Sequence, residues 1–289
     1  MLRRSFFGKK QGGGDGFEGP GAFGPYQLEE LINTGGMAHL WLGTNPEGQT
    51  VAVRLLLADL KHDSLSRKRF VAGCEILQRV HDHACIIHYV EHGILEGQHF
   101  LVMEYLEGLN LKQAMVDETM DLGGLIGNIL IDSAEALEHV HDTGFMHMDF
   151  KPENILISRN GNVRLLDFDL SMTRPESPAK LKKSAGTPAY MAPEQLLGEP
   201  VDHRADIFAY GVMAFEVLTG QKPFVGQSST DILKRQVKRG SEFKTPRSLN
   251  PEIPLPLEKI ILKSLECDPL KRYAHISLLV HELKQCLYV

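Results

Sequence analysis

Apolar and polar positions follow different patterns in the two parts of the chain. In residues 26–103, short apolar runs alternate with turn residues, which is typical of strands. We predict strands at 31–32, 40–42, 50–53, 86–92 and 99–104. One helix is predicted at 66–81, where apolar residues recur at helical spacing from Phe70 to Val80.

Helical periodicity dominates the rest of the chain. The predicted helices span 121–143, 204–219, 231–239, 256–266 and 276–287. A small β-rich part followed by a larger, mainly helical part predicts an α+β fold with two lobes. Residues 1–24 differ from both parts, because eight of them are glycines and few apolar residues remain to offset the entropy of ordering. We predict a flexible glycine-rich tail there.

Composition narrows the class of protein. With 289 residues, 43% hydrophobic and 24% charged, the chain is long enough to build a core without a disulfide or metal. A net charge of −6 argues against a nucleic-acid partner. The four cysteines form no C-x-x-C pair, which favours a reducing, cytoplasmic location. No apolar run reaches the ~20 residues of a membrane-spanning helix, so no membrane span is expected.

Three polar motifs carry the candidate chemistry. They are His-Met-Asp-Phe-Lys-Pro-Glu-Asn at 147–154, Leu-Asp-Phe-Asp at 166–169 and Gly-Thr-Pro-Ala-Tyr-Met-Ala-Pro-Glu at 186–194. In this order and spacing they resemble the eukaryotic-type protein kinase family. The glycine-rich turn at 35–37 is most similar to that of bacterial (Hanks-type) serine/threonine kinases.

The resemblance extends from about residue 26 to the C-terminus. It implies one two-lobed, protein-kinase-like domain at 25–289. Within it we expect a small β-rich N-lobe at 25–103, a hinge at 104–107 and a larger, mainly helical C-lobe at 108–289.

Phosphoryl transfer depends on positioning and charge neutralisation more than on covalent chemistry. By resemblance, Asp149 would orient the substrate hydroxyl and accept its proton, and Lys151 would contact the transferred phosphate, as in serine/threonine-specific members. Asn154 and Asp167 would hold Mg²⁺, a cation that prefers oxygen ligands. Thr187 supports the same substrate class.

The resemblance also implies an ATP site. The residues it assigns to the nucleotide are Gly35, Gly36, Leu40, Ala52, Arg54, Met103, Glu104, Leu106 and Leu156. Ala52 and Leu156 would enclose the adenine ring, and Met103 would border the back of its pocket. The backbone of the hinge would hydrogen-bond the base.

Two further similarities concern the C-lobe. Glu194 matches a family glutamate that pairs with a late arginine, here Arg272, and Asp206 matches the aspartate that holds the catalytic loop. Small-molecule phosphotransferases of related fold build this lobe differently. A protein substrate or protein partner is therefore expected.

The sharpest departures concern the residues that bind phosphate from the N-lobe. The family's third-strand lysine is Arg54, which keeps the charge but differs in shape. Gly73 stands where the family has a helix glutamate that holds this lysine. Glu75 could replace it only after a shift of two residues, which is roughly 200° around the helix. We therefore predict that the family ion pair is absent.

Four smaller departures accompany these. Asn33 and Ala38 replace the first and third glycines of the phosphate loop. Met148 replaces the arginine before Asp149, so a phosphate on the activation segment would lack its usual cationic partner. Asp169 replaces the glycine after Asp167-Phe168, which adds negative charge near the metal site and stiffens a hinge.

Three functions remain open from the sequence. The favoured hypothesis is a Mg-ATP-binding, pseudokinase-like domain in which phosphoryl transfer to Ser or Thr of a protein is impaired or absent. The second is an active but atypical serine/threonine kinase that uses Arg54 in place of lysine, and a distant third is a small-molecule kinase. Candidate phosphorylation sites on the activation segment are Ser171, Thr173, Ser177, Ser184 and Thr187.

Overall fold

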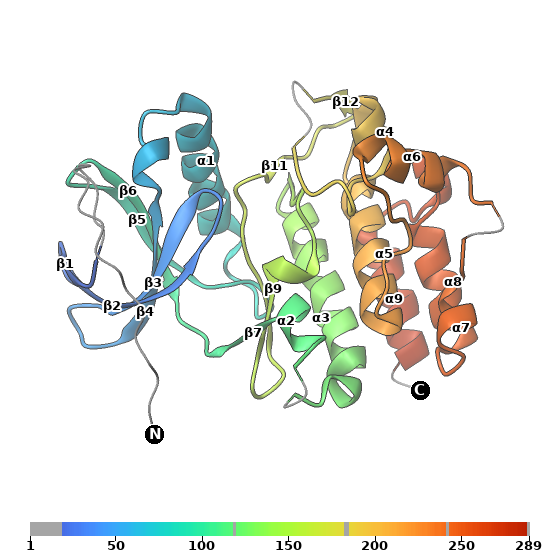
Figure 1. The fold of residues 1–289 in the computed structure, drawn as a ribbon, viewed down its shortest axis with the longest axis horizontal. Helices are drawn as coiled ribbons and strands as arrows, with labels where there is room; N and C mark the ends of the chain where they lie inside the picture. The colour runs from blue at the N-terminus through green and yellow to red at the C-terminus, as the bar shows by residue number, and fades with distance from the viewer. Residues whose placement is uncertain (1–18, 118–119, 182–184, 241–242, 288–289) are drawn as a thin grey trace. The chain divides into compact units, whose positions relative to one another are not determined.

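The computed structural model describes residues 19–117, 120–181, 185–240 and 243–287. They form two compact units, drawn with their elements in Figure 1. The strand unit consists of the described residues up to Lys68 together with His92–Val102. The helical unit consists of Arg69–Glu91 and the described residues from Met103 onward.

A six-stranded sheet runs in the order β1-β2-β3-β4-β6-β5. The strands are β1 (Gly21–Phe23), β2 (Tyr26–Thr34), β3 (Ala38–Thr44), β4 (Thr50–Leu56), β5 (Tyr89–Leu95) and β6 (Gln98–Glu104). β1, β2, β3 and β4 pair antiparallel in sequence order. Every strand predicted from the sequence is present, and each is longer at one end or shifted relative to its prediction.

The two faces of this sheet differ in what they carry. Trp41, Val53 and Leu55 point to one face and belong to the buried apolar core of the strand unit. Because side chains alternate along a strand, the positions between them point to the other face. The register pairs Leu40 with Arg54, so two of the residues assigned to ATP share that second face.

The predicted flexible tail is wrong for its last residues. Gly21–Phe23 forms β1 and pairs with β2, and Phe23 is only 1% exposed. Its ring packs edge-on against Phe100 at a centroid distance of 5.6 Å. Burial of this aromatic ring stabilises the segment as a strand, although its glycine content predicts disorder. Residues 1–18 lie outside the described residues.

Helices form most of the helical unit. They are α2 (Leu111–Ala114), α3 (Leu122–Asp142), α4 (Pro193–Leu197), α5 (Arg204–Thr219), α6 (Ser229–Val237), α7 (Pro246–Leu249), α8 (Leu255–Ser264) and α9 (Ile276–Leu287). Another helix, α1 (Ser64–Val80), begins in the strand unit and continues into the helical unit. The six long helices predicted from periodicity are confirmed, each within two residues at either end.

α5 lies inside the helical unit. Nearly all of its residues are buried on every side, as expected for an interior helix without a polar face. It packs against α8 and α3, and α3 also packs against α9 (Figure 1). In the part of the chain that the structure describes, no helix has the length and apolar character needed to cross a membrane.

Short strands hold the polar motifs of the helical unit. β7 (Gly108–Asn110), β9 (Ile155–Ser158) and β10 (Val163–Leu165) form a small sheet in the order β10-β9-β7. β8 (Phe145–Met146) pairs with β11 (Met172–Thr173), and β12 (Ala179–Lys180) pairs with β13 (Pro200–Val201). The first polar motif therefore connects β8 to β9, and the second follows β10.

Candidate active site

The loop at residues 147–154, to which the resemblance assigns catalysis and which we call the catalytic loop, is held by one buried carboxylate. Asp206 of α5 accepts hydrogen bonds from the backbone N–H groups of His147 and Met148, both at 2.8 Å. His141 Nε2 lies 2.9 Å from the same carboxylate. Met148 has a φ of 68°, a left-handed conformation that is unfavourable for a residue with a side chain. The two hydrogen bonds to Asp206 stabilise this strained backbone.

The ionisation of Asp206 follows from the same contacts. Its side chain is 1% exposed, and burial by itself raises the pKa of a carboxyl. Hydrogen bonding and charge from His141, the charge of His147 and the hydrogen bond from Met148 outweigh that effect, so the pKa of Asp206 lies below its ordinary value. The predicted loop-holding role of Asp206 is confirmed.

Asp149, Lys151 and Asn154 lie together in the catalytic loop. Lys151 Nζ donates to Asp149 Oδ2 at 2.6 Å, and Asn154 Nδ2 donates to the same oxygen at 3.2 Å. Asn154 Nδ2 also donates to the Asp149 carbonyl at 2.8 Å. Lys151 makes a second hydrogen bond, to Thr187 Oγ1 at 3.1 Å, which brings the Gly-Thr-Pro motif to the loop. These bonds hold the Asp149 carboxylate in one orientation, as a positioned general base requires.

The second polar motif lies beside the end of this loop. Leu166 N donates to the Asn154 carbonyl at 2.8 Å, and His147 Nε2 lies 3.0 Å from the Leu166 carbonyl. Asp167 follows directly with a φ of 60°, a second strained position in the same neighbourhood.

The donor chemistry here fits a magnesium ion. Because Asn154 Nδ2 is used by Asp149, its Oδ1 remains as the ligand atom. Asp167 supplies a carboxylate that is partly exposed. Amide and carboxylate oxygens are the ligands that Mg²⁺ takes in proteins.

α1 has the register that the sequence predicts. It buries Phe70, Gly73 and Leu77 and exposes Glu75. A Cβ built on Gly73 would meet Asp169 Oδ1 at 2.9 Å and the Asp169 N and Cα atoms at 3.0 Å. A side chain at position 73 would therefore require Asp169 to shift.

The strand unit positions five of the residues assigned to ATP. Gly35 and Gly36 form the turn between β2 and β3, closed by a 2.9 Å hydrogen bond from Gly35 N to the Ala38 carbonyl. Neither turn glycine has a positive φ. Asn33 also lacks a positive φ, so the tolerance of asparagine for that conformation is not used here. The other three assigned residues lie on β3 and β4: Leu40, Ala52 and Arg54.

The helical unit positions the remaining four. Met103 and Glu104 end β6, Leu106 lies in the segment that follows, and Leu156 lies on β9. The Glu104 carboxylate accepts from Arg164 Nε at 2.8 Å and from His88 N at 3.1 Å. Its side chain is therefore occupied by structural contacts, which leaves the backbone of Glu104 for recognition of a base.

The pair predicted between Glu194 and Arg272 is confirmed. Arg272 donates from both terminal nitrogens to the two Glu194 oxygens, at 2.6 and 2.7 Å, and both side chains are buried. This bidentate geometry is the strongest form of the arginine–carboxylate interaction.

Two structural residues escaped prediction from the sequence. His141 lies in the apolar pattern of α3, and only the fold reveals its contact with Asp206. Glu216 is buried in α5, where it accepts from Tyr190 Oη at 2.5 Å and Lys112 Nζ at 2.6 Å. A charged residue at an interior position of an apolar helix is a signal that could have pointed to Glu216.

The candidate phosphorylation sites differ in accessibility. Ser171 is buried, and its hydroxyl donates to the His147 carbonyl at 3.1 Å. Thr173 and Ser177 are exposed, and Thr187 is partly exposed. Ser184 lies outside the described residues.

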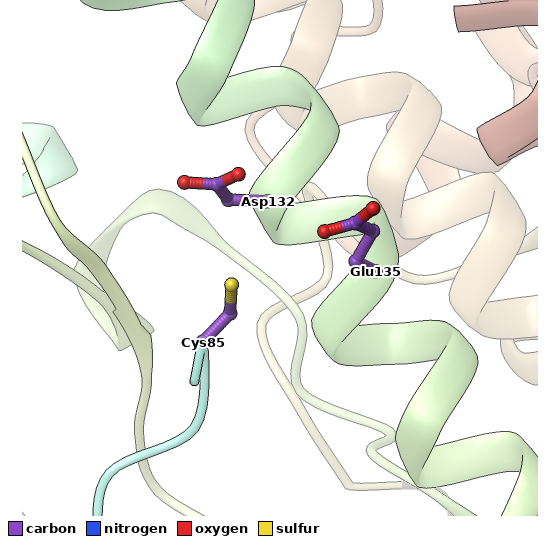
Figure 2. Close-up of side chains that lie close together, drawn as sticks. All are labelled: Cys85, Asp132 and Glu135. Atoms are coloured by element: carbon purple, nitrogen blue, oxygen red, sulfur yellow. The ribbon is translucent and has the colours of Figure 1, made fainter. Parts of the chain in front are cut away.

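A separate group of potential metal ligands lies outside these motifs in the sequence. Figure 2 shows Cys85 beside Asp132 and Glu135, which extend from α3. Their ligand atoms lie within 4.8 Å of one another. Burial and the charge of Asp132 raise the pKa of Cys85 to about 12. Without a metal, Cys85 therefore carries a neutral thiol at neutral pH. Proximity of these three side chains alone does not make a metal site, and we assign it no metal.

The chain is similar to a known family over most of its length. The family model described as protein kinase domain matches residues 26–284. The probable serine/threonine-protein kinase PknB of Corynebacterium glutamicum is 31% identical over 271 residues, which is 89% of this chain and 41% of that protein.

Two other relatives give the same result. The serine/threonine-protein kinase PrkC of Bacillus subtilis is 31% identical over 252 residues, covering 86% of this chain and 38% of that protein. The serine/threonine-protein kinase PknH of Mycobacterium tuberculosis is 32% identical over 266 residues, covering 90% of this chain and 42% of that protein. The chain thus spans about two fifths of the length of these relatives.

Proposed function

The chain belongs to the protein kinase family as a serine/threonine-kinase-like domain, and we propose that it binds Mg-ATP with impaired or absent phosphoryl transfer. The observation that carries the second half of this proposal is Gly73. It is buried at the place of the family's helix glutamate, the backbone of Asp169 lies against it, and Glu75 is exposed.

The loss of that glutamate bears on rate. In the family it holds the lysine that binds the α- and β-phosphates, and here that lysine is Arg54. Losing one positioned charge contact typically lowers a rate by ~10²–10³. Arg54 recovers part of this loss if its guanidinium binds phosphate in a bidentate manner.

Nucleotide binding is supported by the helical unit. Asn154 and Asp167 would supply an amide and a carboxylate oxygen, and the hydrogen bond from Leu166 N to the Asn154 carbonyl brings their two segments together. A bound magnesium ion would neutralise charge on the ATP phosphates there. Nucleotide bound in this way would stabilise the folded domain even without catalysis.

One observation favours the alternative, an active but atypical kinase. Asp149, Lys151 and Asn154 form a complete hydrogen-bonded set, which a pure scaffold does not need. In transfer, Asp149 would take the proton of the substrate hydroxyl. That oxygen would form its bond to the γ-phosphorus while the bond from phosphorus to the ADP oxygen breaks. Lys151 would neutralise charge on the phosphoryl group as it moves.

A protein substrate or partner is favoured over a small molecule. The Glu194–Arg272 pair and the role of Asp206 support this, since both are features of the protein-kinase C-lobe. The relatives are named serine/threonine-protein kinases, which also favours a protein substrate. All four cysteines are free thiols, which supports a reducing compartment such as the cytoplasm.

Binding and transfer can be tested on three forms of the protein: wild type, Asp149→Asn and Arg54→Lys. Mg-dependent ATP binding is measured by thermal shift, and phosphate incorporation by mass spectrometry. We expect a nucleotide-dependent stabilisation of all three and little or no incorporation. Incorporation that is substantial in wild type and vanishes in Asp149→Asn would establish the active kinase instead. The absence of any magnesium-dependent stabilisation would overturn the proposal of Mg-ATP binding.

A further inference from the structure

Two departures from the family pattern meet at one point of the helical unit. Gly73 stands on α1 where the family has a glutamate, and Asp169 stands where the family has a glycine. Asp169 Oδ1 lies 2.9 Å from the position that a Cβ of residue 73 would occupy. The carboxylate missing from the helix is thus matched by another carboxylate lying against the same turn.

We propose that Asp169 is a positioning residue that supplies the counter-carboxylate of the nucleotide site, in place of the helix glutamate. This inference rests on the proposed binding of Mg-ATP and names a residue on which that binding depends. In the family, the helix carboxylate balances and orients the basic residue that binds the phosphates. Here the same charge comes from the segment after Phe168.

The two replacements depend on each other. The Asp169 N and Cα atoms lie 3.0 Å from a Cβ at position 73, so the backbone as well as the carboxylate is in tight contact with any side chain there. A glutamate at 73 therefore requires the backbone at 169 to shift. Glycine at 169 removes the carboxylate and gives that backbone the freedom to do so.

Neighbouring contacts hold Asp169 in place. Phe168 is buried, and its ring packs against His147 at a centroid distance of 5.1 Å. Ser171 N donates to the Phe168 carbonyl at 2.9 Å, and the Ser171 hydroxyl donates to the His147 carbonyl. A carboxylate on this segment therefore has a defined position, as a charge that orients another group must have.

The burial of Asp169 argues against a role that is limited to filling space beside Gly73. The residue is only 7% exposed, and a buried carboxylate is strongly unfavourable unless a cation or hydrogen-bond donors compensate it. A small apolar residue would fill the space over Gly73 without that cost. The nearest alternative carboxylate on α1, Glu75, is exposed and points away from the buried face.

The test measures the Kd for Mg-ATP by titration calorimetry, and the unfolding midpoint without nucleotide. The variants are Asp169→Asn, Asp169→Gly, Gly73→Glu and the swap Gly73→Glu/Asp169→Gly. Asp202→Asn is the matched control, because Asp202 is also buried in the helical unit and pairs with Arg204 at 3.3 Å.

We expect Asp169→Asn and Asp169→Gly to raise the Kd by roughly tenfold or more, the loss typical of one charge-assisted contact. Asp202→Asn should leave the Kd unchanged even where it lowers the unfolding midpoint. The swap should return the Kd to within about threefold of wild type, because it restores the family's glutamate and glycine at these two positions.

Several outcomes would overturn the inference. If wild type binds Mg-ATP and Asp169→Asn binds it equally well, Asp169 has no such role and the proposed function stands. If Asp169→Asn and Asp202→Asn weaken binding alike, or the swap binds no better than Asp169→Gly, the effect of Asp169 is structural only. If wild type itself binds no Mg-ATP, the proposed function fails and this inference fails with it.

Discussion

The loop at 147–154 and the strands that carry the residues assigned to ATP differ in how strongly the fold depends on those residues. In the helical unit, buried polar groups hold residues 147–154. The backbone N–H groups of His147 and Met148 both donate to the Asp206 carboxylate. In the strand unit, the turn glycines contact little, and a Cβ at Gly36 would meet no atom within 4 Å.

This difference accounts for the departures from the family that lie in the strand unit. Replacing a residue of the loop network would leave buried polar groups unsatisfied, which is costly. Replacing a turn glycine, or lysine by Arg54 on the face away from the core, leaves the core of the strand unit intact. Three departures lie in the helical unit instead: Met148 in the loop, and Gly73 and Asp169, which lie against each other.

The strongest test of this comparison is Asp206→Ala. The substitution leaves the N–H groups of His147 and Met148 buried without an acceptor. We expect a loss of about 3–5 kcal/mol in the free energy of unfolding, measured by urea denaturation. Glu199→Ala, at an exposed carboxylate, should change it by no more than about 0.5 kcal/mol. Equal effects of the two variants would show that the loop does not depend on Asp206.

A second test replaces a buried arginine with lysine. Arg272→Lys keeps the charge but cannot reproduce the bidentate pair with Glu194, so we expect a loss of about 2 kcal/mol in unfolding free energy. Arg159→Lys is the control, because Arg159 pairs with Glu107 at 2.7 Å while both side chains are largely exposed. There the loss should stay below about 0.5 kcal/mol. If Arg272→Lys lowered the unfolding free energy no more than Arg159→Lys, the helical unit would not depend on the Glu194–Arg272 pair.

A third test compares one glycine from each unit. A Cβ at Gly108 of β7 would collide with the Ile157 carbonyl and the Ser158 Cα atom. We expect Gly108→Ala to lower the unfolding free energy by about 1–3 kcal/mol. Gly36→Ala should change it by no more than about 0.5 kcal/mol. Chemical denaturation of both variants checks this, and the reverse order would refute the comparison.

The smallest expected effect is a dependence on pH. Because the pKa of Asp206 is lowered in the folded state, its carboxylate contributes stability above the unfolded-state pKa of about 3.9. That contribution is lost as the pH falls through the lower folded-state pKa. Urea titrations between pH 7 and pH 3 should show a steeper loss in wild type than in Asp206→Asn. Parallel curves would mean that the pKa of Asp206 is the same in both states.

Local pattern was enough to predict the long helices and the motifs. Helical periodicity placed α5 and α9 at their observed ends, because each buries side chains at a spacing set by its own sequence. It missed β1 and the short strands β7 to β13. Two to four residues carry no measurable period, and their pairing is decided by partners elsewhere in the chain.

The sequence by itself determined the family, the order of the motifs and the absence of a glutamate at position 73. Only the tertiary structure decided how these parts act together. It joins His141 and Asp206 to the catalytic loop, and it brings Asp169 against Gly73 from nearly a hundred residues away. The physical reason is that hydrogen bonds and excluded volume depend on distance in space. Two replacements that look like separate losses in the sequence are therefore a single local arrangement in the folded chain.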